Sequence, residues 1–202
     1  MVFRKLIGSS LLLGAMSLLA SAPAQAQQAL KNSDISVDGF YQFTQTVSGN
    51  GITDTPSKSG GGAVTFRHSY HWWLGYEAGY GYTRYHEDYT GVPFGIQHNQ
   101  HDFSGSYYVH GPTILVQPFA LVGVSAVLQA PSLNGGQNVS HQWEPGVNFG
   151  VGANVPLLTS HFGLRVEYRG IYYKAPDFGE PTLQTGAYRV TSEPMVGAYL
   201  RF

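Results

Sequence analysis

Charged side chains recur at every second position in parts of the chain, a spacing that places them on one face of a strand. Arg165, Glu167 and Arg169 show it most clearly, since successive strand residues point to opposite sides. Arg67 and Glu77 flank a predicted tight turn and can meet on adjacent strands. Two kinds of chemistry fit, an ion-pair network that fills an interior or a gate for small ions. Because an unpaired buried charge is costly, we predict a network. Its predicted members are Arg67, Glu77, Arg165, Glu167, Arg169 and Arg201.

Serine and histidine residues raise the alternative of a hydrolase, which needs serine, histidine and a carboxylate on one wall. His68 and Ser69 are neighbours, so they lie on opposite faces of a strand. Ser106 and His110 share a face, but strand rise separates them by about 13 Å. We therefore predict no enzyme, no catalytic residue and no cofactor.

Eight histidines raise the alternative of a metal site. Several of them gather in predicted loops next to acidic residues, which together can ligate a transition metal. The residues concerned are His86, Glu87, Asp88, His98, His101 and His141. Their spacing matches no fixed ligand pattern, so the sequence predicts exposed loop histidines and no metal site.

The segment 1–26 is predicted to be a signal peptide. It contains the basic pair Arg4 and Lys5, an apolar stretch over 6–20, and small residues ending in Ala24-Gln25-Ala26, which is the layout of a cleaved secretory signal. The remainder, 27–202, is predicted to form one domain. Acidic residues outnumber basic ones, 12 to 11, so nothing suggests nucleic-acid binding. The absence of cysteine excludes disulfides as a source of stability.

The mature segment is rich in glycine and aromatic residues, with 26 Gly, 14 Tyr and 11 Phe in the chain, and alternating patterns predict eight strands. They cover about 35–47, 64–70, 74–85, 102–110, 114–128, 143–155, 162–173 and 187–202. In the fifth strand the polar and apolar residues share a parity, and we place its polar set, Gln117, Gly123 and Ser125, inward. The first, third, fifth and seventh connections (48–60, 86–101, 129–142 and 174–186) are long and the others short. Short periplasmic turns and longer extracellular loops are typical of transmembrane β-barrels.

The charged strand residues share their face with glycine, and this decides which face meets lipid. An arginine on lipid at the bilayer midplane costs about 2 to 4 kcal/mol. Five such arginines would outweigh the roughly 5 to 15 kcal/mol by which a small domain is usually stable. The charged face is therefore predicted to point inward. A soluble barrel gives the same alternation in the opposite sense, but the export signal, the loop lengths, the inward glycines and the aromatic residues near strand ends favour the membrane.

Three motifs carry a resemblance to a known family: Leu164-Arg-Val-Glu-Tyr-Arg169, Leu74-Gly-Tyr-Glu-Ala-Gly-Tyr80 and the terminal Tyr199-Leu-Arg-Phe202. They resemble the small outer-membrane β-barrel proteins of Gram-negative bacteria, of the OmpA-barrel type, over essentially the whole mature chain. The resemblance implies an all-β, eight-stranded antiparallel transmembrane barrel with up-and-down topology. It also implies that the barrel-assembly machinery reads Phe202, Leu200 and Tyr199. The peptidoglycan-binding domain of larger members is not expected after the barrel.

The resemblance and the patterns together predict a monomeric protein of the outer membrane with a structural or adhesive role. Its expected partners are membrane lipid, lipopolysaccharide, the assembly machinery and an extracellular ligand at the loops. The alternatives are a narrow channel of low conductance, a lipid-modifying enzyme and a soluble periplasmic binder resembling lipocalins.

Overall fold

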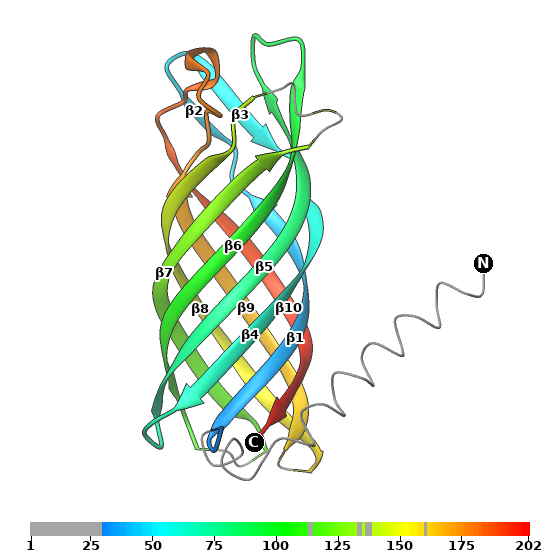
Figure 1. Cartoon of the computed structure of the whole chain (residues 1–202), viewed down its shortest axis with the longest axis vertical. Helices are drawn as coiled ribbons and strands as arrows, with labels where there is room; N and C mark the ends of the chain where they lie inside the picture. The colour runs from blue at the N-terminus through cyan, green and yellow to red at the C-terminus, as the bar shows by residue number, and fades with distance from the viewer. Residues whose placement is uncertain (1–29, 113–114, 133–134, 136–138, 160) are drawn as a thin grey trace, which may run out of the picture.

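The protein forms a closed antiparallel barrel (Figure 1), as predicted. The computed structural model describes residues 30–112, 115–132, 135, 139–159 and 161–202, so the predicted signal peptide lies outside the described residues. The barrel strands are β1 (Ser33–Thr44), β4 (Ser59–Ser69), β5 (Leu74–Tyr89), β6 (Gly95–His110), β7 (Gln117–Pro131), β8 (Gln142–Thr159), β9 (Phe162–Lys174) and β10 (Tyr188–Arg201). Each pairs with its neighbour in this order, and β1 closes the ring against β10. No helix within the described ranges is long and apolar enough to cross a membrane.

Burial alternates along the barrel strands as the sequence predicts. In β7, Gln117 and Ser125 are buried, while Val122 and Val124 are 60% and 67% exposed. The inward placement of the polar set is therefore confirmed, and Phe119 lies inside the barrel with it. The outer surface is apolar and aromatic along the middle of the barrel, which suits hydrocarbon, and the interior is polar.

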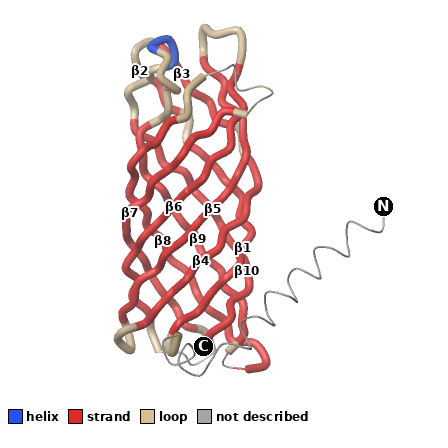
Figure 2. The backbone as a smooth tube through the Cα atoms, in the orientation of Figure 1, coloured by secondary structure: helices blue, strands red, loops and turns tan. Residues whose placement is uncertain are grey.

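The strands β5 and β6 extend beyond this apolar band, and the predicted loop over 86–101 is wrong. Their pairing continues to Asp88 and Gly95, so only residues 90–94 connect them. Above Tyr82 the outward positions carry polar residues such as Arg84 and His86. The apolar alternation that identifies a membrane strand is lost there, although the backbone ladder continues (Figure 2).

The first connection also contains strands that the sequence did not predict. The strand β1 ends at Thr44, and a hairpin of β2 (Val47–Gly49) and β3 (Ile52–Pro56) follows. The strand β3 pairs with the upper part of β5. A seventh connection over 175–187, with the 3-10 turn η1 (Pro181–Leu183), lies beside the hairpin at the upper end (Figure 1).

The expected difference in connection length holds only in part. The third connection, 90–94, is shorter than the fourth, 111–116. The predicted short connection at 156–160 is largely strand, since β8 reaches Thr159 with an irregularity after Pro156. The upper end is still the larger one, because the hairpin β2–β3, the extended β5–β6 pair and the segment 175–187 all lie there.

Candidate functional site

A ring of four alternating charges crosses the middle of the barrel. Arg67 on β4 contacts Glu77 on β5 at 2.6 Å and Glu167 on β9 at 3.0 Å. Arg169 contacts the same two carboxylates at 2.6 and 2.8 Å. All four side chains are at most 3% exposed. We call this group the central ring. Its two positive and two negative charges balance, and its side chains occupy the lumen.

Arg165 lies below the central ring and has its own partners. It donates to Asp34 at 2.6 Å and to Asn154 at 2.9 Å. Sequence reasoning did not include Asp34, although that residue continues the inward parity of Asp38 on β1. Arg201, the sixth predicted member, lies apart from the ring and donates to Gln117 at 2.9 Å.

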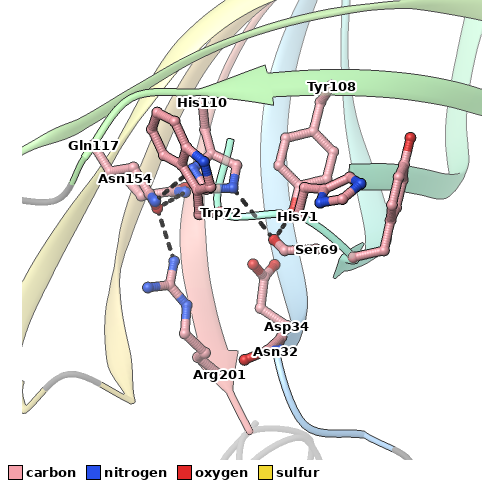
Figure 3. A pocket seen from close by; sticks show the side chains of 11 residues that line it. Asn32, Asp34, Ser69, His71, Trp72, Tyr108, His110, Gln117, Asn154 and Arg201 are labelled. Atoms are coloured by element: carbon pink, nitrogen blue, oxygen red, sulfur yellow. Dashed lines mark hydrogen bonds between the residues drawn. The ribbon is translucent and has the colours of Figure 1, made fainter. Parts of the chain in front are cut away.

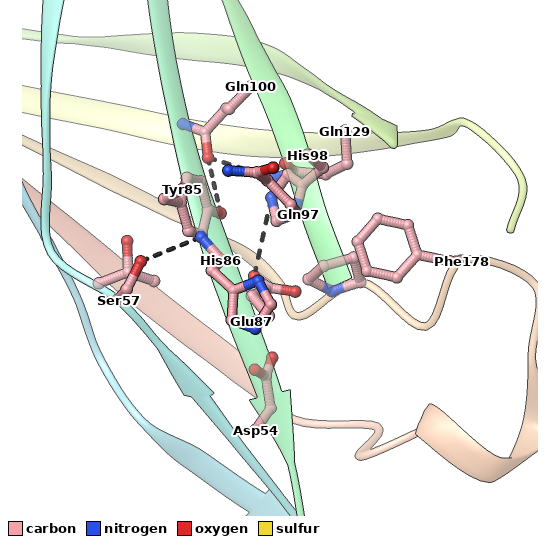
Figure 4. Close-up of polar contacts among 12 residues, drawn as sticks. Asp54, Ser57, Tyr85, His86, Glu87, Gln97, His98, Gln100, Gln129 and Phe178 are labelled. Atoms are coloured by element: carbon pink, nitrogen blue, oxygen red, sulfur yellow. Dashed lines mark hydrogen bonds and ion pairs between the residues drawn. The ribbon is translucent and has the colours of Figure 1, made fainter. Parts of the chain in front are cut away.

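A second buried cluster lies at the upper end, above the apolar band, and Figure 4 shows its members Asp54, Tyr85 and Glu87. Arg189 on β10 contacts Asp54 on β3 at 2.9 Å and also Glu87 on β5. Tyr89 donates to Glu87 at 2.8 Å, and Tyr85 accepts from Arg189 at 3.1 Å. We call Arg189, Asp54 and Glu87 the upper triad. One arginine serves two carboxylates here, and all three side chains are fully buried.

This imbalance changes the protonation of the upper triad. Burial, together with the nearby Glu87 carboxylate, raises the pKa of Asp54 to about 8, although Arg189 opposes the shift. Burial acts in the same direction on Glu87, but the Arg189 guanidinium outweighs it and holds the pKa of Glu87 below its ordinary value. At neutral pH Asp54 therefore keeps a proton and Glu87 is ionised.

The histidines of the upper strands differ in the face of the barrel on which they lie. His98 points inward and is fully buried, with its ring 4.3 Å from Tyr85 and 5.3 Å from Phe178. Burial lowers the pKa of His98, so this side chain is neutral at pH 7. His86 and His101 lie on the outer face, and the described residues contain no group of three ligands able to hold a metal ion. The prediction of exposed loop histidines is wrong for His98.

An apolar cluster covers the upper triad. Phe178 and Leu183, from the segment 175–187, pack with Tyr89 and Ile96 and are at most 3% exposed. The segment is held in place by Gln142, whose side-chain oxygen accepts from the backbone N–H of Phe178 at 2.6 Å. We call the segment 175–187 together with the hairpin β2–β3 the cap. It lies at the upper end of the barrel, next to the upper triad.

The lower end contains a polar cavity of about 460 Å³ (Figure 3). Ser69 and His110 approach to 3.4 Å there, and Tyr108 contacts Ser69 at 2.5 Å. Sequence reasoning missed this pair because its members lie on β4 and β6, which are separated by β5. The other ring nitrogen of His110 contacts the amide nitrogen of Gln117 at 2.9 Å. A hydrolase would place a carboxylate at that position.

The three predicted assembly residues do not share a face. Leu200 and Phe202 have outward parity and are partly exposed, while Tyr199 is 1% exposed inside the barrel. The backbone N–H of Phe202 donates to Ser33 at 2.9 Å, so the end of the chain is tied to the start of β1.

The chain is similar to known proteins of one kind. A family model described as "Outer membrane protein beta-barrel domain" matches residues 12–191. No curated protein sequence matches the chain significantly. Among solved structures, Neisserial surface protein A has a TM-score of 0.63 at 14% identity, covering 85% of this chain and 98% of its own. The outer membrane protein OprG of Pseudomonas aeruginosa has a TM-score of 0.60 at 14% identity, and the match covers 85% of this chain and 96% of OprG. Ail, the attachment invasion locus protein of Yersinia pestis, has a TM-score of 0.52 at 16% identity, and the match covers 85% of this chain and 99% of Ail. That structure of Ail is a complex with the heparin analogue sucrose octasulfate.

Proposed function

Because this chain belongs to the outer membrane protein β-barrel family, we propose that it is a monomeric surface protein with a closed lumen, whose upper end contacts molecules outside the cell. The central ring carries this proposal. Four side chains from three strands meet across the lumen with contacts of 2.6 to 3.0 Å, and an eight-stranded barrel is narrow enough for side chains to fill.

The cap supports the same function. An ion that entered from above would first have to displace the buried apolar cluster of Phe178 and Leu183 and then pass the upper triad. Two separate obstructions therefore lie along one path. A narrow channel is the second candidate function, and the barrel shape is the observation that favours it.

Lipopolysaccharide is a partner that the outer surface suits. Lys58, Arg84 and Lys174 lie at the upper margin of the apolar band and are wholly or partly exposed. Arg84 is held toward the surface by Gln97, whose side-chain oxygen lies at 2.9 Å. Basic side chains at this level match the phosphate groups of lipopolysaccharide. The sugar sulfates bound to Ail are anions of similar chemistry.

An enzymatic role is not proposed. The Ser69 and His110 pair has Gln117 where a hydrolase needs a carboxylate. In the tautomer that accepts the Gln117 amide hydrogen, the nitrogen facing Ser69 carries a proton and is unable to remove one.

Conductance across planar lipid bilayers tests the closed lumen. The refolded wild-type protein should give no discrete conductance steps, because the central ring and the cap both block the path. Arg67→Ala combined with Glu77→Ala removes one arginine and one glutamate of the ring and so leaves no net charge; this variant should conduct only if the cap also opens. Reproducible single-channel steps from the wild-type protein would contradict the proposal and favour the channel.

Binding to lipopolysaccharide vesicles tests the proposed partner. Replacing Lys58, Arg84 and Lys174 together with glutamine should weaken binding, and phosphate-free lipid vesicles should remove the difference between variant and wild type. Equal affinity of both proteins for lipopolysaccharide would exclude this surface as the contact.

A further inference from the structure

The arginines inside the barrel differ in one respect. Arg67, Arg165, Arg169 and Arg189 each contact a carboxylate at 3.0 Å or less. Arg201 contacts no carboxylate among the described residues. Its side chain donates one hydrogen bond to Gln117, at 2.9 Å, and lies against the ring of Tyr199, whose centroid is 5.4 Å from the guanidinium carbon. Arg201 is therefore the one inward arginine of the described barrel that forms no ion pair.

The wall of the lower cavity holds Arg201 in a fixed position. The side-chain oxygen of Gln117 accepts from Arg201 and, at 3.3 Å, from Asn154. The side-chain amide nitrogen of Gln117 contacts Nδ1 of His110 at 2.9 Å. One edge of the Arg201 guanidinium is thus bound to the wall. The remaining donors of its fork make no hydrogen bond to any residue that the structure describes, and a planar fork is suited to a carboxylate.

Aromatic side chains from one turn line the same cavity. The turn between β4 and β5 contributes Tyr70, His71 and Trp72 to the lining, and Figure 3 shows Trp72 and His71 among the lining side chains. Trp72 is 76% exposed. An exposed indole offers an apolar face with a polar N–H at its edge, and the C–H face of a sugar ring packs on such a surface.

We propose that the lower cavity binds a carboxylate-bearing sugar, with its carboxylate on Arg201 and its ring against Trp72. The volume of about 460 Å³ is within the usual range of small-molecule sites. Asp34, which lies opposite Arg201 on the neighbouring strand, contacts Arg165 at 2.6 Å and makes no ion pair with Arg201. The short-turn end of such a barrel faces the periplasm, where sugars released from the cell wall without their peptide carry a free carboxylate. The site thus lies at the opposite end of the barrel from the proposed lipopolysaccharide surface. An experiment that contradicts one of these two proposals does not contradict the other.

A pair of sugars that differ by one carboxylate tests the site on the intact barrel in detergent micelles. N-acetylmuramic acid carries a lactyl carboxylate that N-acetylglucosamine lacks. Titration is followed by the NMR signal of the Trp72 indole N–H, identified with Trp72→Phe. The Trp143 indole, at the upper end of the barrel, should not shift. We expect N-acetylmuramic acid to bind at least tenfold more tightly than N-acetylglucosamine.

Variants separate the two halves of the proposed site. Arg201→Gln should reduce the affinity for N-acetylmuramic acid to that for N-acetylglucosamine, while Lys31→Gln, which removes an exposed cation outside the cavity lining, should change neither. Heat-modifiable migration in gels establishes that each variant is folded. Should Arg201→Gln fail to assemble, Trp72→Ala in the exposed turn still tests the site, because it should weaken the binding of both sugars.

Equal affinity of the wild-type protein for the two sugars, or a preference for the acidic sugar that survives Arg201→Gln, would overturn the proposal. Lactate binding as tightly as N-acetylmuramic acid would overturn the assignment to a sugar.

Discussion

The central ring and the upper triad both bury arginine inside the barrel, but they differ in charge balance. In the central ring two arginines meet two glutamates, and every member contacts two partners. In the upper triad Arg189 alone serves Asp54 and Glu87. The first arrangement has equal numbers of positive and negative groups. The second depends on a proton at Asp54.

The two regions also differ in the elements that hold them. The central ring is built on β4, β5 and β9, which are barrel strands paired along most of their length. Asp54 belongs to β3, which pairs with β5 over only three residues, Asp54 to Pro56. Loss of the central ring should therefore affect the whole barrel, whereas loss of the upper triad should affect the cap alone. The following predictions test this difference.

Replacing Glu77 with alanine should have the largest effect. It leaves Arg67 and Arg169 buried with a single remaining carboxylate, and removal of one partner from a buried ion pair costs about 3 to 5 kcal/mol. The free energy of unfolding, measured by urea titration of the refolded barrel in lipid vesicles, should fall by that amount.

A matched acidic residue on the same strand serves as the control. Asp88 is exposed and contacts His86 at 3.1 Å, so Asp88→Ala should cost less than about 1 kcal/mol. A similar small loss for Glu77→Ala would mean that the central ring does not stabilise the barrel.

Replacing Arg189 with glutamine should have a smaller and local effect. Glu87 would remain buried without its cation, at a cost of about 3 kcal/mol, and opening of the cap relieves this cost by exposing Glu87 to water. Amide hydrogen exchange should accelerate at residues 178–183, while exchange in the middle of β9 stays unchanged. Equal acceleration in both regions would show that the cap and the barrel unfold together.

The sequence predicts the inward side of the barrel well, for a physical reason. Strand geometry fixes parity, so the spacing of Arg165, Glu167 and Arg169 and the high cost of charge in lipid determine which face is inside. The fold and the inward polar face of β7 are confirmed on this basis. Parity carries no information on partners across the lumen, which depend on the stagger of strands. Neither Asp34 with Arg165 nor Ser69 with His110 was predicted for this reason.

The upper end was predicted least well, because its signals differ from those of the membrane band. Above Tyr82 both faces of β5 carry polar side chains, and alternation of apolar residues is lost. The sequence predicts Glu87 and His98 as loop residues, but both are buried. Glu87 contacts Arg189 of β10, and His98 packs against Phe178 of the cap. Such contacts are set by the fold of the cap and are not encoded in local spacing.

A change of pH should have the smallest effect and should act on the cap alone. Asp54 has a pKa of about 8 in the closed cap and an ordinary value, near 3.9, once exposed. The closed state therefore binds a proton that the open state has lost, and its stability falls as the pH rises toward 8. Above pH 8 both states are deprotonated and the loss is complete.

The groups around Asp54 confine this dependence to a narrow range. Glu87 has a lowered pKa and titrates below the range, and Tyr89 has a raised pKa and titrates above it. The pKa of His98 is lowered in the closed state, which opposes the effect of Asp54 below about pH 6.5. Between pH 6.5 and 8 the closed cap should lose about 1.4 kcal/mol of stability per pH unit, which is a tenfold change in its opening equilibrium.

Amide exchange at residues 178–183, corrected for the intrinsic effect of pH, measures this slope. Asp54→Asn should abolish it, since an amide does not titrate. A slope that persists in Asp54→Asn would assign the pH dependence to another group and remove the contrast between the two regions.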